Sequence, residues 1–126
     1  MLSQNLESII PQLEDLTRSL FPEILKIYRN PKSKANHKKD GSPVTAADMY
    51  AHKAIIKFLA KNFPDIPVVS EESFAQKGYK PAKEFWIIDP IDGTKEFVNK
   101  SDEFTTNIAL IQNGKPVLGV VGAPAF

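Results

Sequence analysis

The sequence predicts an α+β fold, with two N-terminal helices packed on an antiparallel sheet. Up to residue 63, apolar residues recur at the spacing of helices with one buried face. From residue 66 onward, the apolar segments become short and rich in β-branched and aromatic residues, which is typical of strands. Because short turns separate the last of these segments, we expect neighbouring strands to run antiparallel. The length of 126 residues fits a single domain.

The first predicted helix covers residues 3–29. Within it, Pro11 is compatible with an early helical turn, whereas Pro22 predicts a kink or a division of the helix. The polar and basic stretch at 29–43 predicts an exposed loop. The apolar residues that we expect on the buried face of the helix are Leu6, Ile10, Leu13, Leu16, Leu20, Ile24 and Tyr28.

The second predicted helix covers residues 45–63. Thr45 and Asp48 match the capping signal S/T-x-x-D/E at its start. The residues that we expect to face inward are Ala51, Ile55, Ile56, Leu59 and Phe63.

Four segments have the composition of strands. The pair Asn113-Gly114 predicts a tight hairpin between the last two, because both residues tolerate a positive φ. The predicted strands cover residues 66–70, 85–89, 104–111 and 117–121.

Composition excludes several classes of function. The formal net charge is +1, which gives no argument for nucleic acid or an anionic membrane as the main partner. The chain has no cysteine, so disulfides, zinc-thiolate sites and thiol catalysis are excluded. Neither a secretory signal nor a membrane-spanning apolar run is recognisable, and we expect a cytoplasmic protein. The glycine-rich motifs of common nucleotide-binding folds are also absent from the sequence.

A group of acidic residues follows two of the predicted strands. Asp89 and Asp92 are separated by Pro90 and Ile91, and Glu71 follows the earlier strand. Two carboxylates and the free carbonyl of Ile91 are hard oxygen ligands, which suit Mg²⁺. Taken singly, each acid is more simply explained as part of a turn or of the solvated surface. Together they predict a magnesium site.

The next residues predict a helix start beside that site. Gly93 and Thr94 follow Asp92 directly, and helix N-termini bind phosphate through unpaired N–H groups. Simple capping by Thr94 is an equal alternative. A metal site beside an anion-binding helix start is typical of enzymes that transfer or hydrolyse phosphoryl groups.

Three motifs resemble the signatures of the inositol monophosphatase superfamily. They are "DPIDGT" at 89–94, the acidic "SEES" at 70–73 and "DGSPVTAAD" at 40–48. Within the superfamily, these motifs and "DGTKEF" at 92–97 are most similar to the CysQ-type 3′(2′),5′-bisphosphate nucleotidases. The resemblance implies an enzyme that is Mg²⁺-dependent and lithium-sensitive. Its expected reaction is hydrolysis of 3′-phosphoadenosine 5′-phosphate to AMP and phosphate, as in sulfur assimilation and nucleotide recycling.

The resemblance also implies roles for individual residues. Glu71, Asp89 and the Ile91 carbonyl would hold the first Mg²⁺, and Asp89 would bridge to a second ion that Asp92 also binds. The complete family site would hold two or three ions. Substrate-binding residues by the resemblance are Glu71, Asp92, Gly93, Thr94 and Lys95.

Further roles concern the attacking water and the approach of the substrate. By the resemblance, Asp48 and Thr94 would orient and deprotonate the water, although a helix cap also explains Asp48. Lys95 is otherwise a solvated residue. Lys39, in the basic loop, could close over the anionic site.

Family members are much longer than this chain, and their second half is an α/β domain. The resemblance therefore implies that residues 1–126 form the metal-binding N-terminal half, with little turnover expected from it alone. We expect it to pair with a C-terminal half or with a second copy, and peripheral contact with the inner membrane face stays open. The alternatives are an inositol monophosphatase and a non-catalytic fragment or assembly module.

Overall fold

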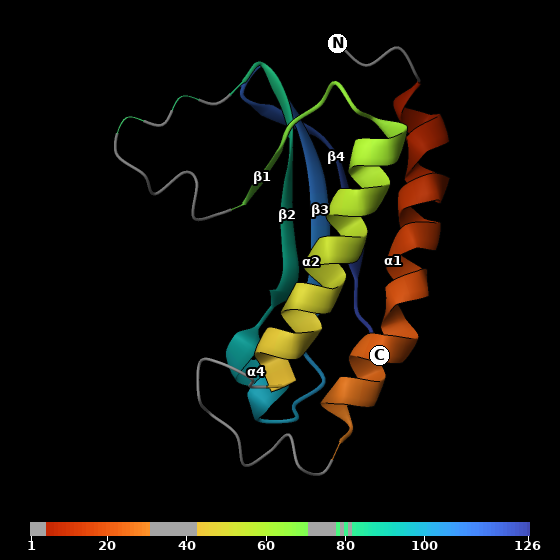
Figure 1. Ribbon diagram of the computed structural model, residues 1–126, viewed down its shortest axis with the longest axis vertical. Helices are drawn as coiled ribbons and strands as arrows, with labels where there is room; N and C mark the ends of the chain where they lie inside the picture. Colours follow the sequence, from red (N-terminus) through yellow and green to blue (C-terminus); the bar gives the residue numbers. More distant parts are fainter. Residues whose placement is uncertain (1–4, 31–42, 71–77, 79, 81) are drawn as a thin grey trace.

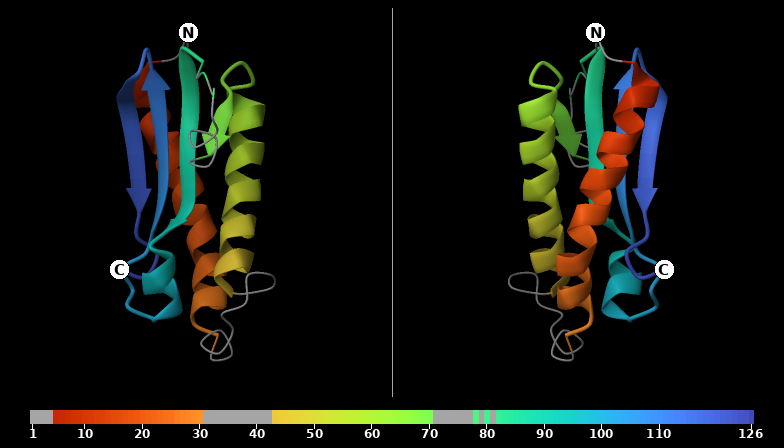
Figure 2. Two further views of the ribbon diagram at one scale, coloured as in Figure 1. Left: turned by 90° about the vertical axis from the view of Figure 1, so that its left-hand side faces the viewer. Right: turned by 90° about the vertical axis from the view of Figure 1, so that its right-hand side faces the viewer.

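The protein is a two-layer structure, with two long helices against one face of a four-stranded sheet (Figures 1 and 2). This computed structural model describes residues 5–30, 43–70, 78, 80 and 82–126. The α+β prediction is confirmed. No helix among these residues is long and apolar enough to cross a membrane. The elements are α1 (Leu6–Tyr28), α2 (Pro43–Asn62), β1 (Val68–Ser70), β2 (Glu84–Asp92), α4 (Thr94–Val98), β3 (Thr105–Gln112) and β4 (Lys115–Gly122).

Helix α1 is continuous and buries one face. The Asn5 side chain caps it by accepting a hydrogen bond from the Glu7 N–H at 3.0 Å. The predicted division at Pro22 is wrong, because this residue lies on the exposed side and the buried face continues across it. Ile10 was also predicted on the wrong face: it is 38% exposed, and Ile9 is buried instead. The buried residues are Ile9, Leu13, Thr17, Leu20, Ile24 and Tyr28.

Helix α2 begins two residues earlier than predicted. Pro43 occupies its first position, where the missing N–H costs nothing and the fixed φ suits a helix. Thr45 is therefore inside the first turn and cannot be the N-cap, so the predicted Thr45–Asp48 capping box is wrong. Ile56 is only partly buried. The fully or nearly fully buried residues of this segment are Ala47, Ala51, Ile55, Leu59 and Phe63.

The sheet is mixed rather than antiparallel. Its order is β1-β2-β3-β4, and β1 runs parallel to β2 while the other two pairs are antiparallel. The prediction of a wholly antiparallel sheet is thus wrong at its first pair. Residues 71–83 connect β1 to β2, and parallel neighbours require a long connection of this kind. The two strands consequently run in the same direction, and the end of the longer strand, β2, lies close to the start of α2 (Figure 1).

The predicted hairpin between β3 and β4 is confirmed. Asn113 and Gly114 have φ values of 52° and 78°, which match a two-residue type I′ turn. This turn sets the pairing of Gln112 with Lys115.

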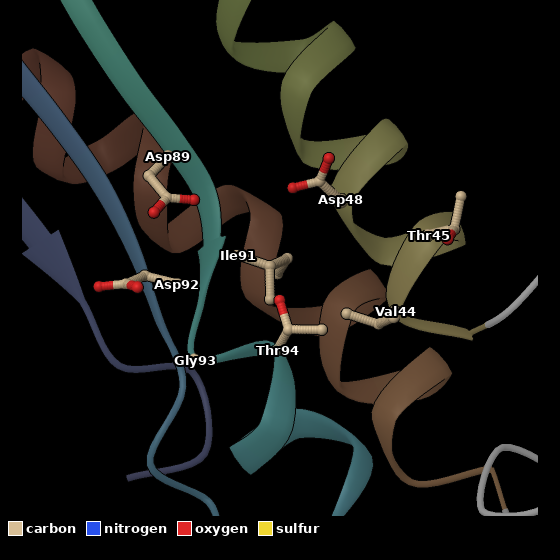
Figure 3. A pocket seen from close by; sticks show the side chains of 8 residues that line it. All are labelled: Val44, Thr45, Asp48, Asp89, Ile91, Asp92, Gly93 and Thr94. Carbon is tan, nitrogen blue, oxygen red and sulfur yellow. The ribbon is translucent and has the colours of Figure 1, made fainter. Parts of the chain in front are cut away.

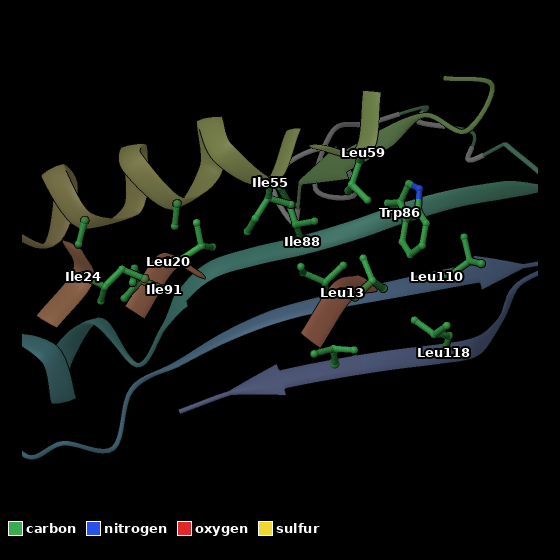
Figure 4. Packing of buried hydrophobic residues seen from close by; sticks show 14 of the residues in the cluster. Leu13, Leu20, Ile24, Ile55, Leu59, Trp86, Ile88, Ile91, Leu110 and Leu118 are labelled. Atoms are coloured by element: carbon green, nitrogen blue, oxygen red, sulfur yellow. The ribbon is translucent and has the colours of Figure 1, made fainter. Parts of the chain in front are cut away.

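The hydrophobic core lies between the helices and the inner face of the sheet. Trp86, which is fully buried, projects from β2 toward α2 (Figure 4), and its ring lies 5.4 Å from that of Phe63. Within the described residues, no helix covers the outer face of the sheet. There Val121 is 70% exposed.

Candidate metal and phosphate site

A β-bulge shapes the end of β2. Asp89 pairs with Asn107 and Asp92 pairs with Thr105, so Pro90 and Ile91 together lie opposite Thr106. The Thr106 side chain is fully buried, and its Oγ1 donates a hydrogen bond to the Pro90 carbonyl at 2.8 Å. This bond stabilises the backbone at a point where the ladder is interrupted.

The bulge places both aspartates on the outer face of the sheet. In a regular strand, residues three positions apart point to opposite faces. Here Pro90 and Ile91 are both buried and together take the place of one residue in the alternation of the strand. Asp89 and Asp92 therefore both avoid the core: the first is partly exposed and the second is exposed.

Gly93 turns the chain from β2 into helix α4. Its φ of 92° and ψ of 52° are left-handed, and its carbonyl accepts the Phe97 N–H at 2.9 Å. A Cβ at this position would lie 3.1 Å from Glu96 Oε1 and 3.3 Å from Phe104 Cα. Conformation and space therefore both favour glycine. The predicted helix start at Thr94 is confirmed.

The end of β2, the start of α4 and the first turns of α2 line one open pocket of about 420 Å³ (Figure 3). In Figure 3 the carboxylate of Asp48 points from α2 toward the end of β2, where Asp89 lies. Two segments far apart in the sequence thus bring their acidic groups together. The lining residues are Val44, Thr45, Asp48, Asp89, Ile91, Asp92, Gly93 and Thr94.

Asp92 faces a second hollow, on the outer side of the sheet. Its carboxylate points away from Asp48 in Figure 3 and accepts a hydrogen bond from Asn107 Nδ2 at 3.2 Å. Asp89 and Asp92 line this hollow of about 430 Å³ as well as the first pocket. The two aspartates therefore form the border between the two spaces.

The remaining predicted residues do not line the pocket or lie outside the described ranges. Lys95 is exposed on α4 and is not among the lining residues. Glu71 and Lys39 lie outside the described residues, although Ser70 pairs with Ile88, the neighbour of Asp89. Sequence reasoning did not identify Asn107, because a single asparagine within a strand carries no recognisable signal.

The donor set fits magnesium in its chemistry. The groups are the carboxylates of Asp48, Asp89 and Asp92, the Ile91 carbonyl and the Thr94 hydroxyl, all of them hard oxygen donors. Within the ranges that the structure describes, no three acidic or histidine side chains form a cluster that could hold an ion. These residues thus supply oxygen donors without forming a closed cage, and magnesium commonly keeps several of its waters.

The profile of the inositol monophosphatase family matches residues 5–126. The chain belongs to the inositol monophosphatase family. It is 47% identical over 120 residues to the 3′(2′),5′-bisphosphate nucleotidase CysQ of Salmonella typhimurium, covering 94% of this chain and 49% of that protein. It is 44% identical over 122 residues to CysQ of Escherichia coli K12, with the same coverage.

Solved structures of this family share the fold. A CysQ from Bacteroides thetaiotaomicron, 44% identical, superposes with a TM-score of 0.69 over 87% of this chain and 40% of that one. An inositol monophosphatase from Zymomonas mobilis, 31% identical, gives a TM-score of 0.77 over 96% and 45%. The predicted family membership is confirmed. The chain spans about half the length of the curated relatives it matches.

Proposed function

We propose that the chain is the metal-binding half of a Mg²⁺-dependent phosphatase that hydrolyses the 3′-phosphate of 3′-phosphoadenosine 5′-phosphate, giving AMP and phosphate. The pocket that joins Asp48 of α2 to Asp89, Asp92 and Thr94 carries the proposal. Support for the substrate comes from the relatives named 3′(2′),5′-bisphosphate nucleotidase, which are 47% and 44% identical to the chain.

In this proposal, the oxygen donors at the end of β2 hold magnesium. Asp89, the Ile91 carbonyl and Asp92 would be ligands, together with Glu71. Bound magnesium would supply positive charge that neutralises the phosphate oxygens and lowers the pKa of water. The two or three ions of a complete family site would need further ligands from a second half.

The residues around the ligands would position the substrate and move a proton. The N–H groups of Gly93 and Thr94 would donate to phosphate oxygens. The Thr94 hydroxyl would orient the attacking water, and Asp48 would accept its proton, since both line the same pocket. Lys95 and Lys39 would add positive charge for a substrate with two phosphates.

The outer face of the sheet is the surface that we assign to a second half or to another copy of the chain. Val117 and Val121 are 38% and 70% exposed there, beside the partly buried Ile87 and Ala109. An apolar face of this kind favours a covering partner.

Hydrolysis of inositol monophosphate is the second candidate. The Zymomonas mobilis inositol monophosphatase supports it through its TM-score of 0.77, although its identity of 31% is lower than that of the CysQ proteins.

The first test is phosphate release from 3′-phosphoadenosine 5′-phosphate, with inositol 1-phosphate as the competing substrate. It would be run with Mg²⁺, with and without Li⁺, on the chain alone and joined to the C-terminal half of a CysQ relative. We expect Li⁺-sensitive release by the joined protein and its loss in Asp89→Asn. A well-folded joined protein without release from either substrate would favour a non-catalytic module.

A further inference from the structure

Asn107 of β3 lies beside the acidic pair. It lies directly opposite Asp89 in the ladder, and its Nδ2 donates to Asp92 Oδ2 at 3.2 Å. One asparagine is therefore adjacent to both aspartates, on the outer face where the second hollow opens.

The chemistry of the amide fixes its orientation. An ionised carboxylate only accepts hydrogen bonds, so the NH₂ group must face Asp92 and the Oδ1 atom must point elsewhere. Oδ1 is buried and has no hydrogen-bond partner among the described residues. A buried polar atom left in this state is costly in a structural position, and it calls for a functional reason.

Asp92 is exposed, so little packing restricts the orientation of its carboxylate, and the hydrogen bond from Asn107 supplies that restriction. An exposed carboxylate samples several rotamers, and holding it ready for a cation requires an external hydrogen bond. Asn107 belongs to the central part of a strand paired on both sides, which makes it a rigid donor.

We propose that Asn107 is a positioning residue, which holds the Asp92 carboxylate in the orientation needed to bind a divalent cation. The proposal rests on the proposed function, since it assigns Asp92 as a ligand. Asn107 acts through Asp92 and not by direct contact with the substrate.

Mn²⁺ titration of the chain provides the test, with calorimetry or electron paramagnetic resonance as the readout. Asn107→Leu keeps the branching at Cγ and removes the donor, and Asn107→Ser leaves a hydroxyl too short to reach Asp92. We expect both variants to bind Mn²⁺ about 10-fold to 100-fold more weakly, the usual loss for a group that orients a metal ligand. Asn62→Leu, a matched change at the exposed far end of α2, should bind like the unmodified chain.

A double-mutant cycle separates positioning from a general structural effect. If Asn107 acts through Asp92, Asn107→Leu should cause no further loss of Mn²⁺ affinity in an Asp92→Asn background. Unchanged affinity in both Asn107 variants, or losses that add to that of Asp92→Asn, would overturn the proposal alone. An unmodified chain that binds no Mn²⁺ and a joined protein that releases no phosphate would overturn the proposed function, and with it the role of Asn107.

Discussion

Gly122, the last residue of β4, lies against Thr17 and Phe21 of α1. A Cβ at this position would be 2.5 Å from Thr17 Cγ2 and 2.8 Å from Phe21 Cζ, both too short for real contacts. The absence of a side chain lets the last strand pack against the first helix. The close packing of β4 against α1 thus requires glycine at this position.

Gly122→Ala should lower the free energy of unfolding by about 1–3 kcal/mol, because the methyl group overpacks this contact. Gly119→Ala is the matched control on the same strand, since its Cβ would lie 3.9 Å from the nearest atom, the Ile108 carbonyl oxygen. Urea unfolding of both variants measures the difference. Equal midpoints for the two would contradict the packing argument.

Thr106 is the residue on which the bulge of β2 depends. Thr106→Val keeps the shape of the side chain but removes the hydrogen bond to the Pro90 carbonyl, leaving a buried acceptor without its partner. We expect a loss of about 1 kcal/mol in the free energy of unfolding. Thr105→Val, at a partly exposed neighbouring position, should change it less in the same urea titration.

At the scale of elements, Tyr28 links the end of α1 to the segment between α4 and β3. Its hydroxyl donates to Asp102 Oδ1 at 2.7 Å and accepts the Asp102 N–H at 2.8 Å. Its ring packs against Phe97 and Phe104, and Lys100 Nζ lies 4.7 Å from the ring centre. Lys100 and Asp102 have positive φ values of 59° and 68°, so these contacts stabilise a backbone that is otherwise unfavourable. The link thereby holds α4, whose first residue, Thr94, lines the pocket.

The same link predicts how stability responds to alkali. Burial raises the pKa of Tyr28 above its ordinary value of 10.0, and its hydrogen bond to Asp102 raises it further. Because the neutral phenol is favoured in the folded state, its contribution is complete below pH 10 and is lost as the pH rises through the higher folded pKa. Free energies of unfolding measured between pH 8 and pH 12 should fall more steeply for the unmodified chain than for Tyr28→Phe. Parallel curves would show that Tyr28 does not titrate in this way.

The helices and the hairpin could be predicted because their signals are local. Apolar spacing defines α1 and α2, and Asn113-Gly114 defines the turn. The direction of β1 could not be predicted in this way, since it depends on where the chain returns after residue 70. Only the length of the segment 71–83 carried that information.

The candidate site was predicted in part, because some of its residues form local patterns and others belong to a neighbouring strand. Asp89, Asp92, Gly93 and Thr94 were predicted from the pattern of the residues, the role of Asp48 came from motif resemblance, and the structure brings all five to one pocket. Their roles stay predictions. Asn107 and Thr106 support this site from a neighbouring strand, and a contact between strands leaves no local mark in the sequence.

For the whole molecule, cation binding should be linked to folding. If Mg²⁺ binds the folded chain alone, a concentration 100 times its dissociation constant should add about 2.7 kcal/mol to the free energy of unfolding. Trp86 is the only tryptophan and is fully buried, so its fluorescence reports the transition. Asp89→Asn should remove the Mg²⁺-dependent increase in the free energy of unfolding. The baseline for both proteins is the free energy of unfolding measured without Ca²⁺ and Mg²⁺. An equal increment in both proteins would mean that the ion binds elsewhere.

The bulge in β2 makes the site depend on the length of a segment as well as on its composition. If these four residues were paired in strict alternation, without the bulge, one of the two carboxylates would point into the apolar interior. A chain that keeps every acidic residue but loses the bulge would therefore be unable to present both carboxylates to an ion. The spacing of the two acids therefore has meaning only together with the bulge, and both are the properties to compare when the site is sought in other chains.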